Sequence, residues 1–505
     1  MLIKNAPTSS AIVTALAIGI VCLSLNRSSV ASPCYYGWIA LAAINDGPNA
    51  EGVFSAETID ELRRSGYQAM DDMQSQYSYL KERLLEIDAK EKGNEMTAKL
   101  RTERAKLVES RDRLETLIDQ VARQRDATTS GLIWHTNIDE AIEEAQKQDK
   151  PILSLRMLGK LTDEFSCANS RFFRTTLYSN QEIAKKLRKD FVLHWKSVRP
   201  VPKITIDFGD GRTLERTITG NSAHYVLDKS GRPLDCLPGL YGPGKFSSWL
   251  DNMKGVNLTT KNLDAETKNK RLKQYHASQN MTAGLSLKIA LAKIDPALVD
   301  KLNNKVPNEE SASGSESIAK KLQTFASKKA NPATAKRVDA RRAAPIAISK
   351  SILEVPILNL AFNPDSINVL DKGMDNDKWE RLAQLHAGIE KLDAASIELI
   401  KRENPTATQA SALTRAKGKT EDKLTRMVES FQRSILIDTV RNEYLLHRKI
   451  HGWFSNEPPT DVDALNKRVY AELFLTPDTD PWLGLKPENV YSGLENDGVK
   501  VAAKK

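Results

Sequence analysis

Cys167 is the residue in this sequence with the clearest potential for chemistry, because a cysteine thiolate is both a nucleophile and a redox group. Ser170 follows it by three positions, and Arg171 and Arg174 add positive charge nearby. If Cys167 lies at the start of a helix, exposed backbone N–H groups and these arginines would lower the pKa of its thiol. The thiolate could then form a mixed disulfide or be oxidised to a sulfenic acid. The alternative, which we favour, is an inert, partly buried cysteine in a domain used for binding.

A second set of residues has the spacing of metal ligands. Glu443, His447 and His451 follow one another at intervals of four, which places them on one face of a helix. Two imidazoles and a carboxylate can bind one metal ion. The pattern is weak by itself, since no further ligand is evident and Arg448 and Lys449 add adverse charge. Hydrogen-bonded histidines that cap a helix are the interpretation we favour.

The remaining polar residues predict structural roles. His194 and His224 fall in expected strands, where a single histidine is usually structural, and Asp207 and Asp210 flank a Gly-rich turn. The sequence has no Gly-rich phosphate loop, Gly-x-Ser-x-Gly elbow, His-Glu-x-x-His motif or Cys-x-x-Cys-His haem site. We therefore expect no cofactor.

Two apolar stripes with helical spacing precede these residues. One comprises Met70, Met73, Tyr77, Leu80, Leu84 and Ile87; the other comprises Met96, Leu100, Leu107, Leu114 and Val121. Lys92-Gly93-Asn94 separates them, which favours an antiparallel helical hairpin, with an extended two-helix coil as the alternative.

Between residues 131 and 253 the pattern changes to short strands mixed with helices. The predicted helices are 138–148, 180–189 and 246–253. The predicted strands are 151–157, 191–195, 205–207, 214–217, 224–227 and 233–236. Cys236 is expected to be a buried strand residue.

This segment resembles secreted thioredoxin-like proteins of the thiol-disulfide interchange type. The matching residues are Trp134-His135, the helix from Asp139, Lys150-Pro151-Ile152-Leu153, Cys167-Ala168-Asn169-Ser170, 177–190, Phe191-Val192-Leu193, Tyr225-Val226-Leu227-Asp228 and Gly231-Arg232-Pro233. The resemblance implies a thioredoxin-like fold with Cys167 at the position of the first active-site cysteine. It covers about a quarter of the chain.

The departures from the family pattern matter for mechanism. Ser170 stands at the position of the resolving cysteine, so the usual intramolecular disulfide cannot form. The family's Gly-x-Pro, which supplies a cis-proline facing the active site, corresponds here to Gly220-Asn221-Ser222. The loop 158–166 is also longer than the family's connection. The resemblance therefore implies a thioredoxin-like domain without dithiol activity.

The N-terminus predicts export. Lys4 precedes an apolar run from Ala11 to Leu25, and Ser29-Val30-Ala31 offers small residues for cleavage. The run has about 15 residues, short of the ~20 that span a bilayer, so a cleaved signal peptide is favoured over an anchor that would hold the protein at a membrane. We expect the periplasm, the cell envelope or secretion. Removal of residues 1–31 leaves three cysteines, so no disulfide framework pairs them all.

The expected fold class is an α/β thioredoxin-like central domain between an N-terminal helical hairpin and a mostly α-helical C-terminal domain. The expected boundaries are a signal peptide at 1–31, an unassigned stretch at 32–54, the hairpin or coiled coil at 55–127, the thioredoxin-like domain at 128–255, a partly disordered linker at 256–344, and the helical domain with an extended tail at 345–505.

Two functions follow from this organisation. The first is a protein-binding or scaffold role in the cell envelope, and the second is single-cysteine redox chemistry that uses Cys167, Ser170 and Arg171. The formal charge of +9 is spread among interspersed acidic residues, so we expect a protein partner and no nucleic acid. The helical hairpin could also mediate self-association.

Overall fold

The computed structural model describes residues 34–303, 374–416 and 423–483, apart from residues 219 and 389. It shows a mixed α/β protein with a small sheet and a high helical content. The predicted signal peptide, residues 304–344 of the predicted linker and the tail beyond residue 483 lie outside the described residues. None of the described helices is long and apolar enough to cross a membrane.

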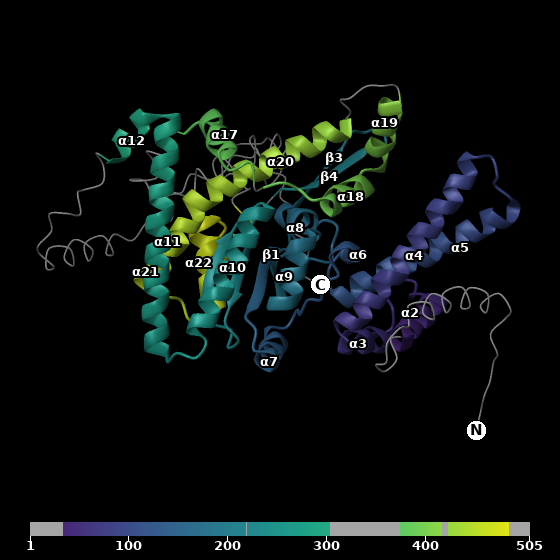
Figure 1. Ribbon diagram of the computed structural model, residues 1–505, viewed down its shortest axis with the longest axis horizontal. Helices are drawn as coiled ribbons and strands as arrows, with labels where there is room; N and C mark the ends of the chain where they lie inside the picture. Colours follow the sequence, from purple (N-terminus) through teal and green to yellow (C-terminus); the bar gives the residue numbers. More distant parts are fainter. Residues whose placement is uncertain (1–33, 219, 304–373, 389, 417–422, 484–505) are drawn as a thin grey trace, which may run out of the picture.

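A four-stranded sheet lies at the centre of the molecule (Figure 1). Its strands are β1 (Ile152–Leu158), β2 (Val192–Arg199), β5 (Ser222–Leu227) and β6 (Pro233–Pro238). The order is β2-β1-β5-β6, in which β1 is parallel to β2 and antiparallel to β5, and β5 is antiparallel to β6. β1, β5 and β6 are buried along their whole length, as expected for strands covered on both faces. The predicted strands are confirmed with small shifts at their ends.

Four helical segments and a hairpin complete this unit. They are α7 (Ile138–Gln148), α8 (Ala168–Phe173), which continues as η1 (Arg174–Tyr178), α9 (Gln181–Asp190), α10 (Pro243–Thr260), and the strand pair β3 (Lys203–Asp207) and β4 (Thr213–Thr217). The β3–β4 turn forms as predicted, because the Asp207 and Asp210 carboxylates accept hydrogen bonds from backbone N–H groups of the turn.

The N-terminal helices form a body of their own beside the sheet. They are α2 (Cys34–Asp46), α3 (Ala56–Arg64), α4 (Tyr67–Lys92), α5 (Ala98–Ala122) and the short α6 (Ala127–Ser130). α4 and α5 pack against each other as the predicted hairpin and project away from the rest of the protein (Figure 1). Residues 34–46, unassigned from sequence, are helical, and Ala40 and Ile44 join the core of this body.

The predicted linker is wrong over its first part. Residues 265–294 form the long helix α11 (Ala265–Ile294), followed by α12 (Pro296–Asn303). The buried positions of α11 are spaced for one helix face, but alanines and a histidine occupy half of them, which weakens the apolar signal. The buried residues are Leu272, His276, Ala283, Leu287, Ala290 and Leu291.

The C-terminal helices share the core of the sheet. They are α17 (Asn376–Gln384), α18 (Ala394–Glu403), α19 (Pro405–Ala416), α20 (Lys423–Arg441), η4 (Asn442–His447), α21 (Arg448–Asn456), α22 (Val462–Arg468) and η5 (Val469–Leu473). Ile400, Phe454 and Leu473 belong to the same buried cluster as Leu153 and Val226 of the sheet. The helices expected near 379, 394, 423–454 and 462–473 are confirmed. They are not packed as a separate domain, because α11 and α21 lie against each other and α21 reaches β6.

The packing of α11 gives a first prediction. Leu291 is fully buried in a cluster with Trp379 and Leu382, whereas Leu285 on the same helix is 58% exposed. Leu291→Ala should lower the free energy of unfolding by about 2–5 kcal/mol, because it removes buried apolar contacts and leaves a cavity. Urea unfolding followed by circular dichroism measures the loss. Leu285→Ala is the matched control, and an equal effect of both substitutions would contradict the placement of α11.

Candidate functional site

Cys167 lies immediately before the short helix α8, but its side chain is fully buried. Its Sγ is 2.8 Å from the hydroxyl oxygen of Ser222 on β5, and the two groups share a hydrogen bond. The Cys167 N–H donates to the carbonyl of Leu158 at the end of β1. The thiol therefore faces the interior and not solvent.

Among the described residues, neither Ser170 nor Arg171 forms a hydrogen bond with the Cys167 sulfur. The Ser170 hydroxyl donates to the Cys167 carbonyl and lies 2.7 Å from the Ser166 hydroxyl. Arg171 donates from Nη2 to Thr217 Oγ1, and its buried Nε has no hydrogen-bond partner among the described residues. Ser170 therefore does not act as a hydrogen-bonding neighbour of the sulfur, whereas the Arg171 guanidinium lies close enough to interact electrostatically with Cys167.

The segment before β5 is covered by the C-terminal region. Asn221 is buried; its carbonyl accepts a hydrogen bond from the Tyr470 hydroxyl, and its Nδ2 donates to Thr476 Oγ1. No peptide bond among the described residues is cis. The backbone that lies opposite Cys167 is therefore bonded to the chain's own C-terminal residues.

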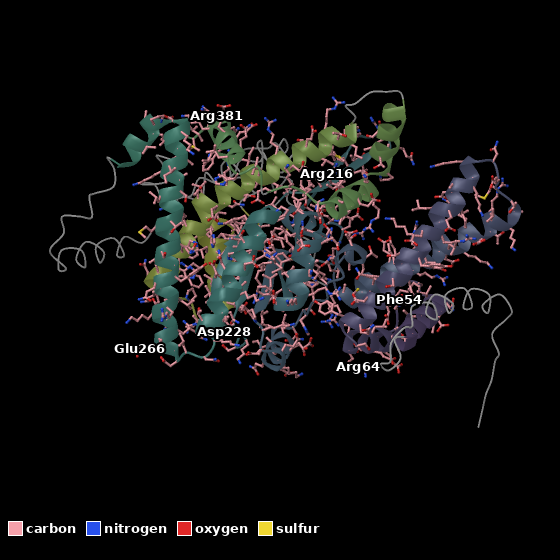
Figure 2. The ribbon with its side chains drawn as sticks, in the orientation of Figure 1. Phe54, Arg64, Arg216, Asp228, Glu266 and Arg381 are labelled. Atoms are coloured by element: carbon pink, nitrogen blue, oxygen red, sulfur yellow. The ribbon has the colours of Figure 1, made fainter. Side chains whose placement is uncertain are left out.

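A cavity of about 890 Å³ lies on the other side of α8. β4, α18 and α20 form further walls, together with Arg125, Asp126, Glu164 and Phe165, and Arg216 of β4 is labelled in Figure 2. Phe172 and Phe431 meet in its lining with ring centroids 4.7 Å apart. Arg171 also lines it and forms no ion pair with a described carboxylate. The cavity therefore presents aromatic surface next to the Arg171 guanidinium, with further charged residues of both signs, among them Glu403 and Arg174, in the same lining.

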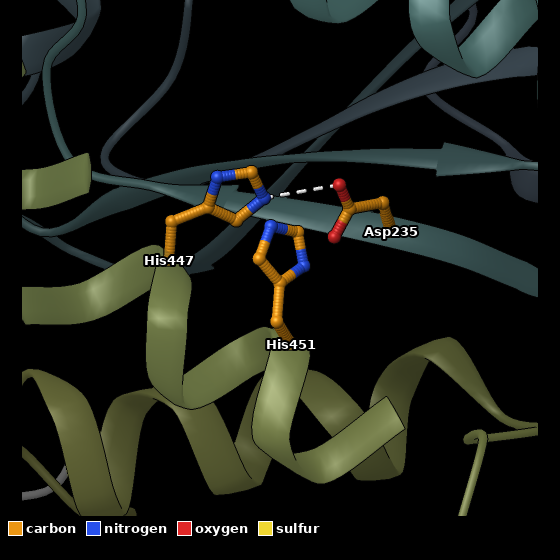
Figure 3. Close-up of side chains that lie close together, drawn as sticks. All are labelled: Asp235, His447 and His451. Atoms are coloured by element: carbon orange, nitrogen blue, oxygen red, sulfur yellow. Dashed lines mark hydrogen bonds and ion pairs between the residues drawn. The ribbon is translucent and has the colours of Figure 1, made fainter. Parts of the chain in front are cut away.

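Glu443, His447 and His451, the candidate metal ligands, lie toward the other end of the sheet from Cys167. Glu443 and His447 lie in η4, and His451 lies one turn later in α21, so the predicted helical face forms. This face points at Asp235 of β6, as Figure 3 shows. One ligand atom from each of Asp235, His447 and His451 lies within 4.8 Å of the others, and all three residues are buried.

Hydrogen bonds hold each member of this cluster. His447 Nε2 is 3.0 Å from Asp235 Oδ2, and His447 Nδ1 is 3.1 Å from Glu443 Oε2. Trp249 Nε1 also donates to Asp235 Oδ2, and Lys245 Nζ donates to Glu443 Oε1. The histidine side chains do not cap a helix, and the Arg448 side chain donates to Asn280 and not to a member of the cluster.

The charges in the cluster follow from these contacts. Burial alone would lower the pKa of His447, but the carboxylates of Asp235 and Glu443 outweigh it and raise the pKa to about 9. Burial alone would raise the pKa values of Asp235 and Glu443, but cationic neighbours, chiefly His447 and Lys245, hold both well below the ordinary range. In the absence of a metal, two carboxylates are therefore balanced by an imidazolium and an ammonium group.

Sequence reasoning missed two members of this cluster. Asp235 lies in a strand whose other residues are apolar, and an acidic residue in such a strand is the signal that could have identified it. His276 lies on α11, within the stretch predicted to be a linker, and its Nδ1 is 2.9 Å from His451 Nδ1.

The other histidines in strands have structural partners, as predicted. His194 Nδ1 is 2.8 Å from the Ser154 hydroxyl, and His224 Nε2 is 2.7 Å from the Tyr178 hydroxyl. Burial lowers the pKa of each to about 3, so both imidazoles are neutral. Cys236 is fully buried in β6, as expected.

Comparison of the chain with family models, curated proteins and solved structures found no match.

Proposed function

We propose that this chain is an exported thioredoxin-like protein without dithiol activity, whose α/β unit binds another protein. The observation that carries the proposal is the complete burial of Cys167 with its sulfur bonded to Ser222. A thiol acts by attack of its thiolate on an accessible sulfur, so a buried thiol is a poor redox centre.

The order of elements supports the thioredoxin-like part of the proposal. β1, the helix after Cys167, β2, the antiparallel pair β5 and β6, and α10 follow one another in the order that the sequence resemblance implies. Ser222, in the segment aligned with the family's cis-proline, lies against Cys167, as that resemblance also implies.

The covered segment at Asn221 argues against a substrate at the cysteine. In the family this position holds the substrate backbone, and here Tyr470 and Thr476 of the same chain take its hydrogen bonds. A peptide could reach Cys167 from this side only after those C-terminal contacts were broken.

The cavity beside α8 is the binding surface that the geometry favours. Phe172 and Phe431 offer an aromatic wall for an apolar side chain, and Arg171 offers a guanidinium group to a carboxylate. We propose a partner protein that inserts a segment with an apolar residue next to an acidic one.

A photo-crosslinking residue tests this surface. Placed at Phe431, it should yield one defined crosslinked protein in cells, whereas the same residue at Phe208, which is 54% exposed on the turn of the β3–β4 hairpin, should not. Arg171→Glu should abolish the crosslink from position 431, because it reverses the charge offered to the partner's carboxylate. Equal crosslinking from both positions, or no effect of Arg171→Glu, would contradict a partner in this cavity.

Single-cysteine redox chemistry is the second candidate function, and alkylation separates it from the first. With Cys22, Cys34 and Cys236 changed to Ser, Cys167 in the folded chain should react with iodoacetamide at least about 100-fold more slowly than in the denatured chain, because local opening must precede reaction. Equal rates in the folded and denatured chain would show an accessible thiol and favour redox chemistry.

Export, protein partners and self-association remain parts of this proposal. The projecting α4–α5 hairpin carries Leu85, which is 60% exposed, and offers a surface for a second copy. A retained signal segment would instead hold the protein at a membrane. Fractionation of cells that express the full chain distinguishes a released from a membrane-bound protein.

A further inference from the structure

The Asp235 cluster has the ligand types of a transition-metal site. Imidazole nitrogens and a carboxylate oxygen are common ligands of Zn²⁺, at about 2.0–2.2 Å from the metal. In a tetrahedral site such ligands lie about 3.4 Å apart. The ligand atoms of Asp235, His447 and His451 lie within 4.8 Å of one another, so small side-chain rotations suffice to surround one ion.

The hydrogen bonds around His276 fix which nitrogen of His451 is free to bind. The Leu234 carbonyl can only accept, so His276 Nε2 carries the hydrogen in the 2.9 Å contact between them. With its hydrogen on Nε2, a neutral His276 imidazole accepts at Nδ1, so its 2.9 Å contact with His451 is a hydrogen bond donated by His451 Nδ1–H. This arrangement leaves His451 Nε2 with a lone pair that can bind a metal.

The groups behind the three ligands match the supporting shell of known metal sites. Metal-binding histidines usually pass their other ring N–H to a carboxylate or similar acceptor, which fixes the ring. Glu443 takes this role for His447, and His276 takes it for His451. Trp249 orients the Asp235 carboxylate. Each ligand is thus held by a partner from another position in the chain.

We propose that Asp235 Oδ2, His447 Nε2 and His451 Nε2 bind one Zn²⁺ ion, or a divalent first-row metal of similar ligand preference. The ion replaces the proton that lies between His447 Nε2 and Asp235 Oδ2, so binding releases one proton to solvent. The 3.0 Å contact between these two side chains lengthens as the metal enters. Lower pH then weakens binding, since the proton competes with the metal.

The surroundings assign the ion a structural role. Asp235 is 0% and His451 3% exposed, so a substrate cannot approach the ion. The ligands come from β6, η4 and α21, and the ion therefore ties the C-terminal helices to the sheet. The Tyr241 hydroxyl is buried without a hydrogen-bond partner among the described residues, and its ring lies 6.5 Å from that of His447. A water at the fourth position of the metal is a suitable partner for it.

Metal binding by the full chain, purified without a histidine tag and stripped with a chelator, tests the proposal. Equilibrium dialysis against Zn²⁺ should give one ion per chain, and Co²⁺ should give the intense visible bands of a four-coordinate site. Asp235→Asn and His451→Gln should each weaken Zn²⁺ binding at least about 10-fold, because each removes a ligand. His224→Gln, which replaces an equally buried histidine outside the cluster, should leave the affinity unchanged.

Glu443→Gln tests the proposal even if substitution of a ligand prevents folding. Glu443→Gln keeps all three ligands and should weaken Zn²⁺ binding about 10- to 100-fold through its effect on His447. Circular dichroism of each metal-free variant establishes that it is folded. No uptake of Zn²⁺ or Co²⁺ by the wild-type chain would overturn the proposal, and so would equal affinity in wild type, Asp235→Asn, His451→Gln and Glu443→Gln.

Discussion

Asp235→Ala should lower the free energy of unfolding of the metal-free protein by about 3–5 kcal/mol, the largest effect that we expect from a single substitution. The Asp235 carboxylate is fully buried and accepts hydrogen bonds from Trp249 and from the His447 imidazolium. Its loss leaves the Trp249 N–H without its acceptor and the positive charge on His447 with Glu443 as its remaining partner. Removal of one member of a buried pair is costly because the other charge stays desolvated.

Urea unfolding in the presence of a chelator measures this effect. Asp149→Ala is the control, since Asp149 also binds two cations, Lys229 and Lys261, but is 49% exposed. Its loss should cost much less, because water screens an exposed pair. Asp235→Asn should fall between wild type and Asp235→Ala, since the amide can still accept from Trp249. Equal stability of Asp235→Ala and wild type would show that the cluster does not hold the C-terminal helices on the sheet.

The sequence predicts the parts of the fold that depend on local pattern. The strands of the sheet and the helices α4, α5, α7 and α9 emerge from apolar spacing and from turn residues such as Gly93 and Asp210. Side chains that are close in the chain form these features, so their spacing suffices. The hairpin of α4 and α5 follows in the same way, because one short turn joins two stripes.

The sequence does not predict contacts between distant segments, and these decide the character of both candidate sites. Tyr470 and Thr476 cover the strand that faces Cys167, although they are about 250 positions away in the chain. Local sequence patterns do not show which distant segments pack over a residue, so the exposed fraction of Cys167 could not be predicted from them. Asp235 and His276 join His447 and His451 for the same reason, through packing of β6, α11 and α21.

The prediction of a linker in place of α11 concealed His276, one of the three histidines of the cluster. A stretch with alanine and histidine at its buried positions has a weak apolar stripe, and tertiary packing rather than sequence pattern makes it a helix. When α11 is recognised as a helix, the face formed by Glu443, His447 and His451 gains a further neighbour. The four-residue spacing alone could not reveal it.

The stability of the metal-free protein should also depend on pH through His447. Its pKa is raised from an ordinary value near 6.5 to about 9 in the folded state. A group whose pKa is raised by folding stabilises the protein fully below its unfolded value, and this contribution is lost as the pH rises through the folded value. The stability should therefore fall between pH 6.5 and 9, by an amount on the order of 3 kcal/mol.

His447→Gln isolates this contribution. Other buried groups titrate in the same window, notably Asp119, with a pKa raised to about 7, and Lys449, with a pKa lowered to about 8, and both are unchanged in the variant. Several other ionisable groups face the His447 ring. They are Asp235 of β6, Glu443 of η4, His276 of α11, His451 of α21 and Tyr241. Lys245 of α10 lies behind Glu443.

The decisive quantity is the difference in unfolding free energy between wild type and His447→Gln, followed by urea unfolding from pH 6 to 9.5 with chelator present. It should shrink steadily as the pH rises, because only the wild type loses the stabilising imidazolium. A difference that stays constant or grows with pH would show that His447 is neutral in the folded protein. The second proton of the two His447 contacts would then belong to a carboxyl group, Asp235 or Glu443, and not to the imidazole.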